Sequence, residues 1–160
     1  MRWIHADPLI QFAQALLQSL GGPVEEAALV AHLLVDANLS GHDSHGVMQI
    51  PGYIDAHAGG LIAPGIGFTR ERETAATALV DGHWGFGQRL AHEAITLGID
   101  KAQRCGISAV GAYRCYHVGH LGAYARLAAE AGMVGIIAVN DGGGGQRVAG
   151  GTPGVRAVVL

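Results

Sequence analysis

Residues 76–113 read ATALVDGHWGFGQRLAHEAITLGIDKAQRCGISAVGAY, two short apolar segments with a long amphipathic segment between them. The first segment, 76–82, has the composition of a strand that ends in a turn. A helix is predicted over 87–105, where Gly106 closes it, and a second strand over 107–113. A strand, a crossing helix and another strand favour a parallel or mostly parallel sheet covered by helices.

The same pattern continues toward the C-terminus. A shorter helix is predicted over 121–132 and a strongly apolar strand, MVGIIAVN, over 133–140. The expected fold class is therefore α/β, with a βαβαβ unit that is incomplete, because an open sheet of three strands leaves its edges and one face poorly covered. The tail over 150–160, GGTPGVRAVVL, has apolar residues without an obvious partner. We expect the chain to be truncated, or to be completed by another chain.

The part of the chain before this unit has a helical pattern. Helices are predicted over 7–20, 24–39 and 51–58. Apolar residues recur at helical spacing in the first of them, and Asp7 is expected to cap its N-terminus. Residues 59–75 carry little periodic signal and are interpreted as the crossing between the two units.

The composition indicates a globular protein and excludes several partners. Apolar residues make up 49% and charged residues 14%, so a core can be buried. The formal charge is −3 and the basic residues are scattered, which predicts binding to neither nucleic acid nor a membrane surface. Two cysteines form no disulfide framework and favour a reducing cytoplasm. The N-terminus has no signal-peptide pattern, and the longest apolar run is too short to span a bilayer.

The glycines do not form an ordinary nucleotide-binding motif. The sequence has 26 glycines in 160 residues, which predicts tight turns and close backbone approaches. Gly85 and Gly87 begin a GxGxxG pattern, but Leu90 stands where the third glycine belongs. No GxxxxGK[ST] is present either. A Rossmann or P-loop site is therefore unsupported, and the GGGG run at 142–145 is interpreted first as a turn.

Two histidine pairs raise the possibility of a metal site. His42 and His45 are three residues apart, as are His117 and His120, with Cys115 nearby. Imidazole and thiolate are good zinc ligands. However, neither HExxH nor CxxC is present, and nine histidines give some close pairs by chance. No residue is assigned to a metal.

The loop CYHVGHLGAY, 115–124, favours acid–base chemistry. It follows a predicted strand and precedes a predicted helix, and ligands of α/β sheets bind at the carboxyl ends of strands. His117 can move a proton near neutral pH. The plainer interpretations are a loop histidine bonded to backbone for His117, a cap for Ser44, and a core residue for Tyr53.

Three segments carry a resemblance: GHDSHGVMQIPGYIDAHAGGLIAPG, LVDGHWGFGQRLAHEAITLGIDKAQRCGISAV and HVGHLGAYARLAAEAGMVGIIAVN. Together they resemble the type-2 malate/L-lactate dehydrogenase family, which also includes hydroxycarboxylate, ureidoglycolate, sulfolactate and imine-reducing relatives. The resemblance covers about residues 7–140 and rests on SHG, a following tyrosine and HxGxxGxYA in this order. It implies a nicotinamide-dependent oxidoreductase whose fold is unrelated to Rossmann domains. It divides the chain into a helical unit, 1–72, and a partial NAD(P)-binding α/β domain, 73–160.

The resemblance also implies roles for individual residues. His117 matches the catalytic acid/base of a reaction between a 2-hydroxy and a 2-keto acid. The matched positions around the substrate are Ser44, His45, Gln49 and Tyr53, and those against the cofactor, NAD or NADP, are His45, Gly119, His120 and Leu121. The stretch HDSHGV, 42–47, is then an active-site wall. The implied assembly is a homodimer in the cytoplasm.

This sequence departs from the family at three places. Gln49 stands where many relatives have arginine, and an amide cannot give the fork of charge-assisted bonds with which arginine holds a carboxylate. His120 stands where relatives often have arginine. After Asn140 the family continues into a Pro-Phe-Gly-Gly-like turn and much more chain, whereas this sequence changes near Ala149, as a truncation or a shifted reading frame would produce.

Two other functions compete with the dehydrogenase. A truncated remnant without catalysis could act as a binding or assembly module, which the unfinished sheet favours. A small metalloprotein could use the two HxxH pairs. The intact SHG and HVGHLG motifs favour the enzyme.

Overall fold

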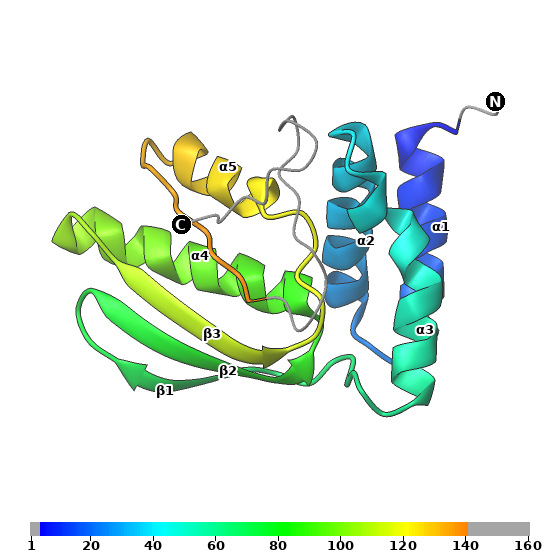
Figure 1. Cartoon of the computed structure of the whole chain (residues 1–160), viewed down its shortest axis with the longest axis horizontal. Helices are drawn as coiled ribbons and strands as arrows, with labels where there is room; N and C mark the ends of the chain where they lie inside the picture. Colours follow the sequence, from blue (N-terminus) through cyan, green and yellow to red (C-terminus); the bar gives the residue numbers. More distant parts are fainter. Residues whose placement is uncertain (1–3, 141–160) are drawn as a thin grey trace.

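A computed structural model describes residues 4–140 of the chain (Figure 1), so the GGGG run and the tail lie outside the described residues. The helical unit contains α1 (Ala6–Gln18), α2 (Val24–Leu39), two short 3₁₀ helices, η1 (Asp43–His45) and η2 (Val47–Gln49), and α3 (Ile50–Ala58). The α/β unit contains β1 (Thr69–Glu73), β2 (Thr77–Gly85), α4 (Gly87–Cys105), β3 (Ala109–Cys115) and α5 (Gly122–Glu130).

The three predicted N-terminal helices are confirmed with one change at the first cap. His5, not Asp7, is the N-cap residue of α1, and Asp7 lies inside the first turn. A carboxylate there still interacts favourably with the partial positive charge of the helix N-terminus. Ala13 and Leu17 of α1 are buried against α2 and α3, as the apolar spacing predicts.

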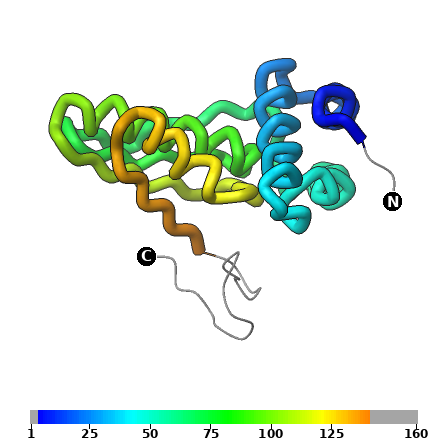
Figure 2. Tube along the Cα trace, turned by 90° about the horizontal axis from the view of Figure 1, so that it is seen from above, coloured from blue at the N-terminus to red at the C-terminus, as the bar shows by residue number. Residues whose placement is uncertain are grey.

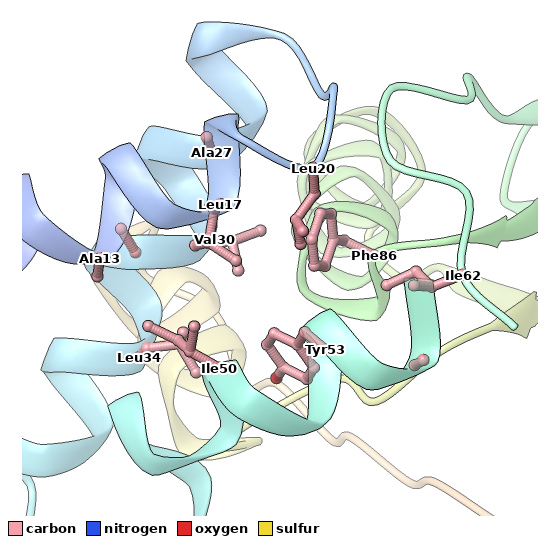
Figure 3. Packing of buried hydrophobic residues seen from close by; sticks show 12 residues of the cluster. Ala13, Leu17, Leu20, Ala27, Val30, Leu34, Ile50, Tyr53, Ile62 and Phe86 are labelled. Carbon is pink, nitrogen blue, oxygen red and sulfur yellow. The ribbon is translucent and has the colours of Figure 1, made fainter. Parts of the chain in front are cut away.

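The helical core extends into the α/β unit through one aromatic side chain. Phe86, which directly precedes α4, packs in the cluster that α1, α2 and α3 form, and Figure 3 shows it between Leu20 and Ile62. Tyr53 of α3 meets the Phe86 ring edge to face at 5.7 Å between centroids. Burying a large side chain stabilises the fold by about 1.5–3 kcal/mol. This contact fixes the start of α4 relative to α3.

The sheet contains the predicted parallel pair. β2 and β3 are parallel, with Thr77 opposite Ala109 and Asp81 opposite Tyr113. α4 covers one face through Leu90 and Leu97, and α5 packs on α4 (Figure 1). Gly106 ends α4 in the left-handed conformation, at φ 80°. α4 therefore connects two parallel strands, as the sequence predicts.

A further strand, β1, lies in the segment that was interpreted as a crossing. It pairs antiparallel with β2 and gives the order β1-β2-β3. Its sequence, TRERE, is exposed along its whole length. Because neither side of β1 faces a core, its side chains carry no apolar alternation from which a strand could be predicted.

The strand predicted over 133–140 is wrong for the described chain. These residues form no strand, and Figure 2 shows them leaving α5 as a single extended trace. Val134 is 92% exposed and Ile136 is 74% exposed. A strand requires a ladder of hydrogen bonds to a neighbouring strand, and the sheet of residues 4–140 contains only β1, β2 and β3. The described unit is therefore βαβ with an additional antiparallel strand, rather than βαβαβ.

A buried carboxylate joins the two parallel strands. Asp81 of β2 is 1% exposed and accepts hydrogen bonds from the Arg114 guanidinium of β3. That guanidinium, together with the backbone N–H of His83, holds the pKa of Asp81 well below its usual range. His83, Trp84 and Arg114 have positive φ, so the chain bends sharply where β2 and β3 lose register.

Candidate active site

The centre of the site is a pair of side chains from the two units. His117 lies on the loop between β3 and α5, and Tyr53 lies on α3. Tyr53 Oη is 2.9 Å from His117 Nδ1, and the Gln88 amide is 2.5 Å from the same hydroxyl. Tyr53 is fully buried, and burial raises the pKa of its hydroxyl well above the ordinary value. Tyr53 is therefore a neutral hydroxyl at every physiological pH.

The HDSHGV stretch forms the wall opposite this pair. Ser44 Oγ is 2.9 Å from His45 Nδ1, and the His45 ring lies 5.3 Å from the His117 ring, centroid to centroid. Gly46, between η1 and η2, has an extended backbone, and a Cβ there would lie 2.3 Å from the Asn38 amide. That amide accepts from the Val47 backbone N–H at 2.9 Å. Asn38 thus fixes the turn that presents Ser44 and His45.

The two remaining histidines of these motifs stack on each other. The His42 and His120 rings are 4.2 Å apart and inclined by 24°. Burial lowers the pKa of His120, and the neighbouring His42 lowers it further; the same two causes lower the pKa of His45. His120 Nδ1 is buried and has no hydrogen-bond partner among the described residues. The imidazoles of His45 and His120 are therefore neutral near neutral pH.

The histidines do not form a metal centre in the described part of the chain. Residues 4–140 contain no group of three His, Cys, Asp or Glu side chains that could hold a metal ion. His117 and His45 instead contact a tyrosine and a serine hydroxyl. Helices of this part are also too short or too polar to cross a bilayer.

Glycines bring the backbone of this loop close to α4. A Cβ at Gly87 would lie 2.1 Å from the Tyr116 carbonyl oxygen, so only glycine allows the first turn of α4 to touch the loop. Gly119 is buried with φ +76°, the left-handed conformation that glycine adopts readily. Gly87, the second glycine of the incomplete GxGxxG pattern, thus allows α4 to pack against the loop that carries His117. Gly119, His120 and Leu121 form one continuous backbone segment beside His117.

The structure brings most of the predicted site residues together. Tyr53, His117, His45 and Ser44 form a chain of contacts, and His120 lies on the same loop as His117. The Gln49 side chain folds back on the segment that precedes it, where Nε2 donates to the Ser44 carbonyl at 2.5 Å. Its amide therefore supports the wall that presents Ser44.

Three polar or aromatic residues of the site were not predicted. Gln88 and Asn38 are helix residues with no motif around them, and Phe86 lies in the GFG stretch that was tested only as a nucleotide motif. Gln88 follows GFG in the first turn of α4, and its amide is buried to 1% exposure. Burial of that kind depends on tertiary packing and is not encoded in local periodicity.

Comparisons with known proteins show the family of this chain. The family model for malate/L-lactate dehydrogenase matches residues 4–154. The chain belongs to the malate/L-lactate dehydrogenase family. It is 41% identical over 131 residues to hydroxycarboxylate dehydrogenase B of Escherichia coli K12, covering 82% of this chain and 36% of that protein. It is 38% identical to a malate dehydrogenase of Pyrococcus abyssi, covering 94% of this chain and 43% of that protein.

Solved structures of the family share the fold. The malate dehydrogenase from Pyrococcus horikoshii OT3 superposes with a TM-score of 0.78 at 38% identity, over 81% of this chain and 37% of that one. The sulfolactate dehydrogenase from Methanocaldococcus jannaschii gives 0.76 at 34%, over 78% and 36%. The predicted fold class is confirmed: a helical unit followed by an incomplete α/β unit of this family, not a Rossmann domain. The chain spans well under half the length of these relatives.

Proposed function

We propose that this chain carries the acid–base half of a nicotinamide-dependent dehydrogenase that interconverts small 2-hydroxy and 2-keto acids. The observation that carries the proposal is the contact of His117 with the buried Tyr53 hydroxyl at 2.9 Å, beside the Ser44–His45 wall. Relatives named for oxidising malate, sulfolactate and hydroxycarboxylates support the substrate class.

His117 is the proton-exchanging group in this proposal. Oxidation of a 2-hydroxy acid needs its hydroxyl proton removed, and a neutral imidazole takes up that proton. In the reverse direction the imidazolium donates to the keto oxygen as negative charge develops there. Tyr53 orients the ring through Nδ1 and keeps its own proton, because burial raises the pKa of its hydroxyl. Ser44 and His45 then face the substrate.

The substrate carboxylate needs a cation that Gln49 does not provide. Where relatives have arginine, the Gln49 amide donates to the Ser44 backbone. A neutral amide that is bonded to the Ser44 carbonyl gives the substrate carboxylate neither a positive charge nor a pair of parallel hydrogen bonds. We therefore expect a preference among 2-hydroxy acids that differs from that of relatives with arginine at this position.

The cofactor in this proposal is NAD or NADP, and the residues present fit its nicotinamide end. His45, Gly119, His120 and Leu121 would hold it. Gly119 offers backbone without a side chain, and the buried His120 Nδ1 lacks a partner among the described residues. Such a cofactor, when bound, supplies or takes up the hydride. The His45 and His120 imidazoles are neutral near pH 7, because burial lowers the pKa of both rings.

A homodimer in the cytoplasm completes the proposal. The cysteines Cys105 and Cys115 are both free thiols in the structure, which fits a reducing compartment. A second candidate function, an assembly module, is favoured by the exposed apolar side chains of Val134 and Ile136. That function requires binding of another chain and no cofactor.

Titration of NADH and NADPH into the purified chain, followed by nicotinamide fluorescence, tests the proposal. We expect saturable binding of one of the two, and a 2-hydroxy acid such as malate, lactate or sulfolactate to alter its affinity. The variant Gly119→Val, which places a branched side chain at φ +76° against Gln88, should weaken binding at least about tenfold. Absence of binding to a folded sample would contradict the dehydrogenase and leave the assembly module.

A further inference from the structure

Gln88 lies one side chain away from His117. It belongs to the first turn of α4, is 1% exposed, and its amide reaches the Tyr53 hydroxyl at 2.5 Å. A Cβ at Gly119 would lie 3.3 Å from Gln88 Cγ, so the side chain is held between α3 and the catalytic loop. Gln88 thus completes a chain of three side chains, Gln88–Tyr53–His117, whose members come from α4, α3 and the loop after β3.

The tyrosine hydroxyl in the middle of this chain has one proton to donate. When it donates to His117 Nδ1, the neutral ring carries its proton on Nε2. When it donates toward residue 88, Tyr53 accepts from His117 Nδ1–H, and Nε2 keeps its lone pair. The group at position 88 therefore acts, through Tyr53, on which nitrogen of His117 is protonated.

The proposed reaction requires one of these arrangements, because a base that takes up a proton at Nε2 needs the lone pair of that nitrogen. In the structure Nε2 of the amide lies toward the hydroxyl, and Oε1 is buried without a hydrogen-bond partner among the described residues. A half-turn of the amide exchanges oxygen and nitrogen without moving other atoms. With Oε1 in that place, the amide accepts the Tyr53 hydroxyl proton and leaves the lone pair of His117 Nε2 available.

We propose that Gln88 is a positioning residue whose carbonyl oxygen accepts the Tyr53 hydroxyl proton and thereby keeps His117 protonated on Nδ1. This inference rests on the proposed function, in which His117 exchanges a proton with the substrate. Both forms of His117 in that exchange, the neutral base and the imidazolium, carry a proton on Nδ1. One orientation of Gln88 therefore serves both directions of the reaction, and Nε2 alone gains and loses the proton.

Nitrogen NMR of the chain with ¹⁵N-labelled histidine tests this directly. The His117 signals are assigned by their loss in His117→Gln, and the pH is set where the ring is neutral. We expect the Nδ1–H tautomer in the wild type and in Gln88→Glu, because a carboxylate only accepts. In Gln88→Leu the ratio should shift toward Nε2–H by about fivefold or more, the ratio that one lost hydrogen bond implies. Gln103→Leu, an exposed position on the same helix, should leave the ratio unchanged.

A wild-type ring protonated on Nε2, or an unchanged ratio in Gln88→Leu, would overturn the inference. If Gln88→Leu does not fold, Tyr53→Phe replaces it, since it removes the hydroxyl, retains the ring and should cause the same shift. The measurement requires no turnover. A tautomer that follows position 88 in a protein whose activity survives loss of His117 would contradict the proposed function and leave Gln88 as the residue that orients this ring.

Discussion

Gly46 shows at the scale of one residue how the wall of the candidate site is built. It separates η1 from η2, and the Asn38 side chain occupies the space where a Cβ would project, at 2.3 Å. Asn38 also donates to Asp43 at 2.6 Å and accepts from Val47. A methyl group at position 46 would displace this amide and with it the turn that presents Ser44.

Gly46→Ala should therefore lower the free energy of unfolding by about 1–3 kcal/mol, the usual cost of forcing an extra methyl group into packed surroundings. The matched control is Gly52→Ala, since a Cβ at Gly52 in α3 meets nothing within 4 Å. That change should stabilise the chain by about 0.4–1 kcal/mol through the unfolded state. Urea unfolding of the two variants measures both effects, and equal effects would contradict the packing described for Asn38.

At the scale of elements, the parallel pair β2–β3 depends on a charge. The Arg114 guanidinium lowers the pKa of Asp81 below its ordinary value near 4. A carboxyl group with a lowered pKa in the folded state contributes stability above its unfolded-state pKa. That contribution falls as the pH drops below about 4 toward the pKa of the folded protein.

Asp81→Asn should remove this part of the acid dependence and lower stability at pH 7, because Arg114 then loses its ionised partner. Thermal unfolding of both proteins between about pH 3 and pH 7 measures the effect. The difference between their melting temperatures should be largest at neutral pH and shrink on acidification. A difference that stays constant over this range would show that the ion pair does not link the strands.

Helices and strands were predictable from the sequence when one of their faces packs against a hydrophobic core. The helices over 6–18, 24–39 and 87–105 and the strands β2 and β3 have such faces. β1 does not, because its TRERE side chains are all exposed. Residues 133–140 have a strand-like composition, but composition cannot provide the neighbouring strand that pairing requires.

At the scale of the whole molecule, the site forms where the helical unit meets the α/β unit. The SHG and HVGHLG motifs pointed to Ser44, His45 and His117, and Tyr53 followed from its place after SHG. The buried amide of Gln88 was not predictable, since it depends on α4 starting against the loop that carries His117, which Gly87 allows. Stacking of His42 on His120 likewise joins residues 78 positions apart, a distance that local patterns do not report.

The most direct test of the account is the oxidation of NADH or NADPH by 2-keto acids, with the wild-type chain, His117→Gln and His57→Gln. His57 is an exposed residue of α3 outside the site, so it controls for loss of a histidine. We predict that His117→Gln lowers turnover at least about 100-fold, as loss of a general acid/base does, while His57→Gln remains within about twofold. Undiminished turnover by His117→Gln would contradict the assignment of His117 as the acid/base, and no turnover by the wild type would contradict dehydrogenase activity of this chain by itself.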